Sequence, residues 1–237
     1  MMRRRPVPNP LRRGRGNPFQ PDPLDRLEGA CKEAGIDLPR ETLGQGLAYL
    51  VRMLEENKKL NLSGIRDLDR ALILHLLDSL WIAGAVREAP ARILDIGSGN
   101  GFPGAIAACI WPQAECLLVE RTQKKARAIQ SCLGDTHLSN ARVLAEDAAA
   151  LPAHHKDLRE SCDLVLTRAT GPIAAMNRLA APLLRPGGSI FHWKSETVDA
   201  KERREGLISA KKLGLHPRDD LIYPLGERKR RLLRFQK

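Results

Sequence analysis

One stretch of this chain constrains its fold more than any other. A short apolar run ends in an acid, three glycines follow at alternate positions, and a proline comes next: Arg92-Ile93-Leu94-Asp95-Ile96-Gly97-Ser98-Gly99-Asn100-Gly101-Phe102-Pro103-Gly104. Glycine lets the backbone adopt positive φ and approach a ligand closely, and proline is tolerated in a first helical turn. The pattern predicts a strand, a glycine turn and a helix N-terminus, the unit at which doubly wound α/β folds bind nucleotide-like ligands.

The spacing of the glycines distinguishes two cofactors. A dinucleotide fingerprint is G-x-G-x-x-G, whereas here the third glycine comes one residue early and Phe102 takes its usual place. Asp95 would repel a pyrophosphate, but it can accept hydrogen bonds from the ammonium group of S-adenosylmethionine. The turn therefore resembles motif I of the Rossmann-like methyltransferases, although a glycine-rich turn without a ligand is the alternative. The expected cofactor contacts are Asp95, Gly97, Ser98, Gly99, Gly101 and Phe102.

The next predicted strand supplies an acid for the ribose. Residues 115–120 form a short apolar run that ends in Glu120, roughly 20 residues after the glycines, where an acid binds ribose hydroxyls in this type of fold. A surface ion pair of Glu120 with Arg121 or Lys124 is the alternative.

The third predicted strand and its loop, residues 140–148, point to the adenine. Methyltransferases hold adenine in this loop, often through a backbone N–H and an aspartate, so Asp147 and Ala148 are the expected contacts. Asp147 is equally suited to cap a helix that starts at Ala148.

Composition limits the class of protein. The 237 residues suffice for one α/β domain with an appendage, no apolar run approaches the ~20 residues of a membrane span, and the net charge of +11 favours an anionic partner, nucleic acid first. A basic but otherwise ordinary enzyme is the alternative. Five cysteines without a C-x-x-C pair predict small core residues in a reducing cytoplasm, with no disulfide and no metal site. We expect a monomer.

Three regions follow along the chain. Residues 1–23 hold six arginines among scattered prolines and predict a disordered basic arm. Residues 24–90 predict a helical cap, with one helix around residues 43–54, a loop at 57–65 and a second helix from Asp69 to about Ala85. Residues 91–237 predict an S-adenosylmethionine-dependent methyltransferase domain.

The second helix of the cap is apolar nearly all round, which is typical of a buried helix. His75, Asp78 and Ser79 interrupt it on one face, since they stand three and four residues apart. A hydrogen-bond network that docks the helix on the sheet and a polar patch beside the cofactor are both open.

The remaining strand signals complete a seven-stranded sheet. They fall at residues 162–168, 189–194, 220–223 and 230–235, and the last strand is expected to be antiparallel. The predicted fold class is α/β: a Rossmann-like class I methyltransferase with an N-terminal helical extension.

Several motifs occur together in an order that narrows the resemblance. They are Asn-x-x-x-Asn-Leu-Ser-x-Ile (57–65), His-Leu-Leu-Asp-Ser-Leu (75–80), Leu-Asp-Ile-Gly-Ser-Gly-x-Gly-x-Pro-Gly (94–104), Thr-Arg-Ala (167–169) and the lysine that ends the fifth predicted strand, Lys194. Over residues 40–237 the chain resembles the glucose-inhibited division protein B family, bacterial methyltransferases of 16S (small-subunit) ribosomal RNA that act on guanine N7. The resemblance implies S-adenosylmethionine as the cofactor and 16S ribosomal RNA as the substrate, either as free RNA or within the small ribosomal subunit.

The chain departs from the family pattern in three places. Glu146-Asp147-Ala148-Ala149 replaces the usual Gly-Arg-Ala-Glu, Ser195 replaces a typical glycine, and the arginine arm is an extension.

The residues of the chain can be compared with what methylation at different atoms of a base requires. Amino-group methylation commonly uses an Asn/Asp-Pro-Pro-aromatic turn after strand four, but residues 168–171 read Arg-Ala-Thr-Gly. Pyrimidine C5 methylation needs a nucleophilic cysteine, and no cysteine is placed for it. Guanine N7 needs only positioning and electrostatics, because its lone pair is free.

Arg168 and Lys194 are the expected catalytic residues, since cations bind guanine O6 and phosphates, and Arg168 is also expected to contact the cofactor. Salt bridges at the edge of the sheet are the alternative for both.

Three rival functions remain open at this point. They are methylation of another RNA atom, a non-catalytic RNA-binding protein on a methyltransferase fold, and a dehydrogenase. The intact glycines with Asp95 and Glu120 argue against the second, and the lack of residues for a separate substrate domain argues against the third.

Overall fold

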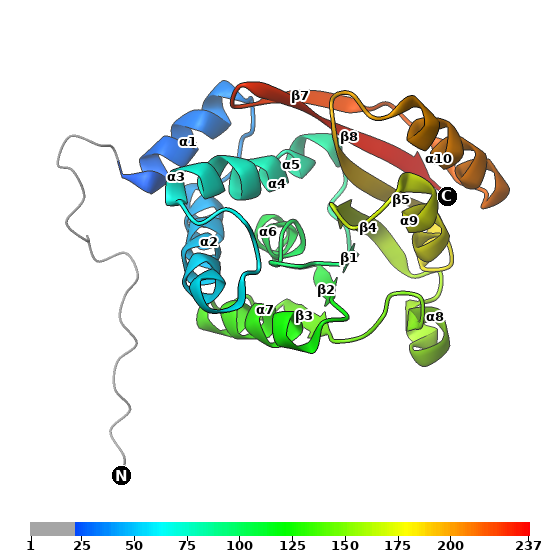
Figure 1. The fold of residues 1–237 in the computed structure, drawn as a ribbon, viewed down its shortest axis with the longest axis horizontal. Coiled ribbons are helices and arrows are strands. Elements are labelled where there is room, and N and C mark those ends of the chain that lie inside the picture. The colour runs from blue at the N-terminus through cyan, green and yellow to red at the C-terminus, as the bar shows by residue number, and fades with distance from the viewer. Residues whose placement is uncertain (1–21) are drawn as a thin grey trace, which may run out of the picture.

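The centre of the molecule is one sheet, built in the computed structural model from eight strands of the described residues, 22–237 (Figure 1). The strand order is β3-β2-β1-β4-β5-β8-β6, and β7 pairs with β8 beside β6. Strands β1 to β5 are parallel, and β8 runs antiparallel to β5. The strands are β1 (Arg92–Ile96), β2 (Glu115–Val119), β3 (Ala141–Leu144), β4 (Cys162–Arg168), β5 (Leu184–Ser195), β6 (His216–Pro217), β7 (Leu221–Leu225) and β8 (Arg228–Gln236).

All seven predicted strands occur, and the antiparallel last strand is confirmed. The eighth strand, β6, has two residues and continues the edge that β7 forms on β8. It was not predicted, because a two-residue bridge has no period of its own.

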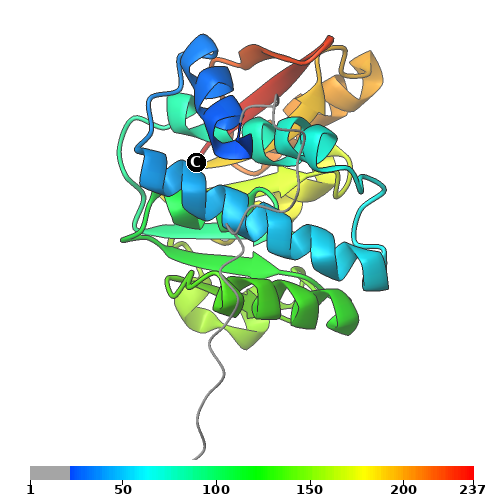
Figure 2. The same cartoon turned by 90° about the vertical axis from the view of Figure 1, so that its left-hand side faces the viewer.

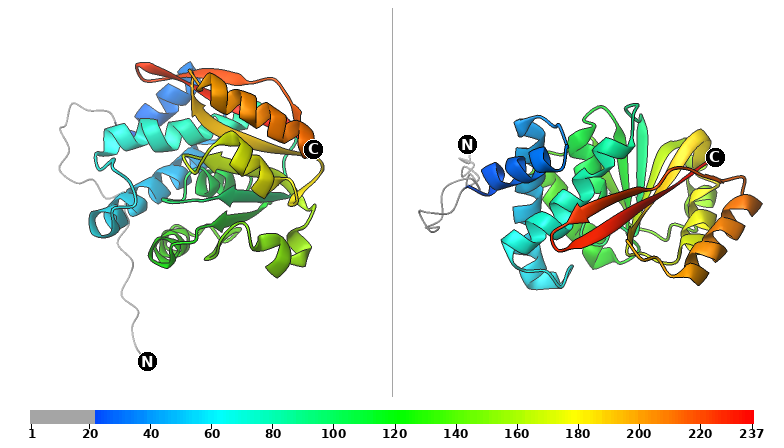
Figure 3. Two further views of the ribbon diagram at one scale, coloured as in Figure 1. Left: turned by 45° about the vertical axis from the view of Figure 1, so that its right-hand side comes forward. Right: turned by 90° about the horizontal axis from the view of Figure 1, so that it is seen from above.

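Alternate residues of the strands face two separate cores, because successive side chains of a strand point to opposite faces. In β1, Ile93 packs under the N-terminal helices, whereas Leu94 and Ile96 pack under the C-terminal ones. The view from above shows the two helical layers with the sheet between them (Figure 3).

The first layer consists of the N-terminal helices together with α6 and α7. Its helices are α1 (Pro23–Glu33), α2 (Arg40–Leu60), α3 (Leu68–Ala71), the π-helix η1 (Leu72–Leu77), α4 (Asp78–Leu80), α5 (Ile82–Ala85), α6 (Gly104–Ile110) and α7 (Gln123–Asp135). Figure 2 shows α2 running across this face between α1 and α7. Tyr49, Leu50 and Met53 of α2 are fully buried against it.

Two details of the cap differ from the prediction. The loop expected at 57–65 begins only after Leu60, since α2 continues to that residue and ends with Asn61 in the left-handed conformation. The second helix is a series of short α turns around the π-helix η1. The predicted arm lies outside the described residues, apart from Asp22 and Pro23, which begin α1.

The second layer covers the opposite face. It contains α8 (Leu151–His154), the 3₁₀ turn η2 (Lys156–Leu158), α9 (Ile173–Ala180) and α10 (Ala200–Lys212). In the part of the chain that the structure describes, no helix combines the length and apolarity needed to cross a membrane.

Candidate active site

A cavity of about 790 Å³ opens at the carboxyl ends of β1, β2, β3 and β4. Its size falls in the range of small-molecule and cofactor sites, and its position is the crevice where open α/β sheets bind ligands. Of the predicted cofactor residues, Gly97, Ser98, Gly99, Phe102, Glu120, Asp147, Ala148 and Arg168 line it. Asp95 and Gly101 lie behind its wall, and Lys194 lies outside it.

Two glycines of the turn are required by close neighbours as well as by φ. Gly97 has φ +70°, and a Cβ there would lie 2.4 Å from Thr170 Cγ2 in the loop after β4. Gly101 has φ +86°, and a Cβ there would lie 1.7 Å from the hydroxyl oxygen of Tyr49. The turn is therefore held between the β4 loop on one side and helix α2 on the other.

Asp95 lies directly under the turn and is fully buried. Its Oδ2 accepts a hydrogen bond of 3.0 Å from the backbone N–H of Gly104, the first residue of α6, while its buried Oδ1 has no hydrogen-bond partner among the described residues. Burial raises the pKa of the Asp95 carboxyl to about 6. A buried carboxylate oxygen without a donor fits the ammonium group expected from the sequence.

This raised pKa gives a prediction about stability and pH. The folded chain holds the Asp95 proton at pH values where the unfolded chain has lost it, so the free energy of unfolding falls as pH rises from about 4 through about 6. The loss reaches at most about 3 kcal/mol. Asp95→Asn is expected to flatten this dependence, measured by urea unfolding near pH 4 and near pH 7. An equally steep fall in the variant and the original chain would contradict it.

Glu120 lies where β2 ends and binds the glycine turn. Its Oε2 accepts from the backbone N–H of Gly99 at 3.0 Å, and its Oε1 accepts from that of Thr122 at 2.8 Å. The side chain forms no ion pair with Arg121 or Lys124 in the described residues, so the surface alternative is not what the structure shows. Glu120 is 6 % exposed and lines the cavity.

The loop after β3 is compatible with both interpretations of Asp147, a contact with adenine and a cap of the next helix. Asp147 and Ala148 line the cavity as expected. The Asp147 Oδ1 also accepts a 2.9 Å hydrogen bond from the backbone N–H of Ala149, and its carbonyl accepts from Ala150. Asp147 thus caps a turn that leads into α8, which begins three residues later than the sequence predicted.

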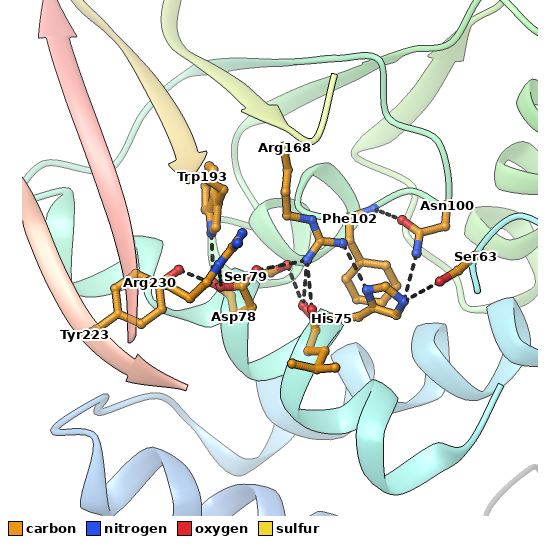
Figure 4. A network of polar contacts seen from close by, with 11 residues as sticks. Ser63, His75, Asp78, Ser79, Asn100, Phe102, Arg168, Trp193, Tyr223 and Arg230 are labelled. Atoms are coloured by element: carbon orange, nitrogen blue, oxygen red, sulfur yellow. Dashed lines mark hydrogen bonds and ion pairs between the residues drawn. The ribbon is translucent and has the colours of Figure 1, made fainter. Parts of the chain in front are cut away.

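Arg168 points from the end of β4 into a network of polar side chains (Figure 4). Its guanidinium donates to Asp78 Oδ2 at 3.3 Å and to His75 Nδ1 at 3.2 Å, and it lies 5.7 Å from the ring centre of Phe102. The Arg168 side chain is 9 % exposed and that of Asp78 is 2 % exposed. Burial lowers the pKa of Arg168, and the Asp78 charge opposes that effect.

Lys194 faces the other side of the sheet. Arg168 pairs with Trp193 across β4 and β5, and the next residue along β5 must point the opposite way because strand side chains alternate. Lys194 Nζ donates to Glu202 Oε1 at 2.7 Å and to the Gly171 carbonyl at 2.9 Å. The structure therefore does not bring the two expected catalytic cations together at one rim.

His75 and Asp78 both line the cavity, and both also bind Arg168 of β4, which docks their helix on the sheet. The polar face of this helix is therefore both a docking network and a patch beside the cavity. The neighbouring Ser79 neither lines the cavity nor binds the sheet, since its hydroxyl donates to the His75 carbonyl within the same helix. Burial and the charge of Arg168 lower the pKa of His75 to about 3. We infer a neutral ring whose Nδ1 accepts from Arg168, which assigns the hydrogen to Nε2, 2.9 Å from Ser63 Oγ. π-helices such as η1 are frequent at functional sites.

The loop after α2 reaches the cavity in a way that the motif alone did not reveal. Leu62 and Ser63 line the cavity. The buried Asn57 side chain clamps the loop: its amide nitrogen donates to the carbonyls of Ser63 and Ile65, and its amide oxygen accepts from the Ser63 N–H at 2.7 Å. Asn57 therefore explains the Asn-x-x-x-Asn-Leu-Ser-x-Ile pattern as a loop anchor.

Two other lining segments were not predicted. Thr170 follows β4, next to Ala169, whose φ of 56° is unusual for a non-glycine residue. Arg228, Lys229 and Arg230 begin β8 and line the far wall. Four consecutive basic residues at 228–231 were visible in the sequence as a charge run, but nothing in the sequence placed them at the cavity.

The cysteines take no part in the site. All five are buried and none lines the cavity, and burial raises the pKa of the Cys162 thiol to about 11. Within residues 22–237, no three His, Cys, Asp or Glu side chains are grouped so that they could hold a metal ion.

Comparison with known proteins gives concordant results. Residues 44–217 match the family model described as rRNA small subunit methyltransferase G. The chain is 34% identical to Ribosomal RNA small subunit methyltransferase G of Bordetella avium over 78% of this chain and 81% of the relative, and 30% identical to that of Carboxydothermus hydrogenoformans over 84% of each. Among solved structures, the O-methyltransferase from Bacillus cereus in complex with SAH is similar, with a TM-score of 0.60, 15% identity and coverage of 90% of this chain and 97% of that chain. The last similarity concerns the fold.

Proposed function

Because the chain belongs to the rRNA small subunit methyltransferase G family, we propose that it transfers a methyl group from S-adenosylmethionine to a guanine N7 of small-subunit ribosomal RNA. The observation that carries the proposal is the shared cavity: the glycine turn and Glu120 form one wall, and Arg168 with its polar network forms another. Cofactor-type and base-binding groups thus face one space.

The residues present fit the cofactor. The turn at Gly97 and Gly99 exposes backbone at the carboxyl end of β1, Glu120 offers carboxylate oxygens to ribose hydroxyls, and Asp147 with Ala148 border the adenine side. Asp95 Oδ1 is an unsatisfied buried acceptor next to this turn. When bound, the cofactor supplies an electrophilic methyl carbon on a positively charged sulfur.

The arrangement of groups favours N7 over other atoms of a base. No thiol lines the cavity, so the covalent route to a pyrimidine C5 lacks its nucleophile. His75 is neutral, with its Nδ1 already engaged by Arg168, so it does not serve as a base that removes an amino proton. Guanine N7 loses no proton, and its methylation requires only that the base be held in line and its developing charge be stabilised.

Arg168 and Lys194 take different roles in this proposal. Arg168 lines the cavity, and its guanidinium is the group that we expect to contact guanine O6, the acceptor that arginine prefers. Lys194 acts from the opposite face, since its bond to the Gly171 carbonyl holds the loop that carries Thr170. It is a positioning residue for the wall of the cavity.

Methyl transfer from radiolabelled S-adenosylmethionine tests the proposal. The purified chain is incubated with small-subunit rRNA and, separately, with assembled small subunits, and the modified nucleoside is identified by mass spectrometry. We expect label in 7-methylguanosine of the small-subunit RNA and none in large-subunit RNA. Label in another nucleoside refutes the N7 assignment, and cofactor and RNA binding without transfer would identify a non-catalytic RNA-binding protein.

Glu120 gives a prediction about cofactor affinity. Glu120→Ala removes the acceptor for ribose hydroxyls and releases the Gly99 N–H, so S-adenosylmethionine should bind about 1–3 kcal/mol more weakly in calorimetry. Glu115→Ala is the matched control, because Glu115 lies at the other end of the same strand and pairs with Arg92. Equal affinities of the two variants would remove Glu120 from the cofactor site.

A further inference from the structure

The hairpin of β7 and β8 carries the basic wall of the cavity. Its two-residue turn, Gly226 and Glu227, joins Leu225 to Arg228. Arg228, Lys229 and Arg230 line the cavity, whereas Glu227 in the same turn does not. The other lining lysine and arginine side chains besides Arg168, those of Arg121 and Lys125, follow β2 beside Glu120, on the side assigned to the cofactor.

The base of this hairpin is fixed to the polar network. Tyr223 donates to Asp78 Oδ1 at 2.6 Å and stacks on Trp81 with ring centres 4.6 Å apart. Arg230 Nε reaches the same Asp78 oxygen at 3.4 Å, and Trp193 Nε1 donates to the Asp78 carbonyl at 2.9 Å. Figure 4 shows Tyr223, Arg230 and Arg168 converging on Asp78. The position of the hairpin relative to the cavity is therefore set by buried contacts.

The hairpin carries more basic side chains than the nearby carboxylates can neutralise. Asp78 is shared between Arg168 and Arg230, and Asp220 is shared between Arg231 and Arg203. Lys229, whose side chain is 60 % exposed, pairs with Glu196 at 3.6 Å at the surface, where such a pair is weak. Exposed Arg228 has no ion pair within the described residues. At the rim, Arg228 is therefore an exposed cation without a carboxylate partner, and Lys229 has only a weak surface pair that a phosphate can replace.

We propose that Arg228 and Lys229 are a phosphate-binding site for the RNA strand whose base enters the cavity. The inference rests on the proposed function and adds the surface that holds the substrate. A base can reach such a cavity only if its nucleotide leaves the stack, and its flanking phosphates then remain at the rim. Arginine and lysine at the rim neutralise phosphates and fix the register of the strand without reading sequence.

Charge reversal at these two positions tests the site. We expect Arg228→Glu/Lys229→Glu to raise the dissociation constant of a small-subunit rRNA transcript about tenfold or more, and to flatten the plot of log affinity against log salt by ~0.7 per lost phosphate contact. Affinity for S-adenosylmethionine and the thermal midpoint should stay unchanged, since both side chains are exposed.

The matched control is Lys201→Glu/Arg204→Glu. It makes the same change in net charge on α10, at positions that do not line the cavity. Equal losses in both double variants, or no loss in either, overturn the inference, as does failure of the unchanged chain to bind the transcript. A transcript that binds through the hairpin but receives no methyl group overturns the proposed function and leaves the phosphate site standing.

Discussion

Replacing Asp78 with alanine is expected to lower the free energy of unfolding by about 3–5 kcal/mol, because it leaves the buried guanidinium of Arg168 without its carboxylate. The Tyr223 hydroxyl loses its acceptor in the same step. Methyl transfer should fall with stability, since β4, β7 and β8 meet at this one side chain. Urea unfolding of the purified variant measures the effect.

Two controls distinguish the loss of a carboxylate that neutralises a buried cation from the loss of an exposed carboxylate. Asp135→Ala removes a carboxylate that is 51 % exposed in its pair with Arg52, and should change stability by no more than about 1 kcal/mol. Asp78→Leu combined with Arg168→Met should regain much of the stability, because an apolar pair of similar size replaces both buried charges, yet it should remain inactive. A stable Asp78→Ala variant, or activity in the apolar pair, would refute the role given to this network.

Gly101→Ala is expected to be the most damaging single change in the glycine turn. Overpacking against Tyr49 costs about 1–3 kcal/mol, and an alanine at φ +86° adds about 1–2 kcal/mol. Because the turn must shift to make room, affinity for S-adenosylmethionine should fall at least about tenfold, or 1.4 kcal/mol. Calorimetry and urea unfolding give the two readouts.

Gly134→Ala is the matched control for that change. Gly134 lies in α7, where an added Cβ would enter open space, so alanine there should raise stability by about 0.5–1 kcal/mol. If Gly101→Ala behaved like Gly134→Ala, the contact between α2 and the turn would have no influence on the cofactor site.

The positions of the strands along the chain and the glycine turn were predictable because each rests on local pattern. Short apolar runs, each followed by turn residues, gave β1 to β5, and the alternate glycines marked the end of β1. Eight of the ten expected cofactor residues line the cavity for the same reason: the carboxyl ends of parallel strands meet at one edge. The family resemblance drawn from the motifs is confirmed by the match over residues 44–217.

The features that sequence reasoning missed depend on orientation and on distant contacts. Lys194 was placed at the correct end of the correct strand, but the one-residue offset from Trp193 turns it to the other face. Asp95 does not itself line the cavity, because its Oδ2 binds the backbone at the start of α6, and its contact with the cofactor stays a prediction. The basic residues of β8 reach the cavity through Tyr223 and Asp78, which are 145 residues apart along the chain.

The contact between Tyr49 and the glycine turn bears on how this molecule could be divided or recombined. A fragment beginning at residue 91 would lack α2, expose the apolar face that Leu50 and Met53 cover, and leave the turn at Gly101 unsupported on one side. The helical cap and the α/β region would therefore not behave as interchangeable modules. In a chimera between two relatives, α2 and the glycine turn would have to come from the same parent for the ligand site to form.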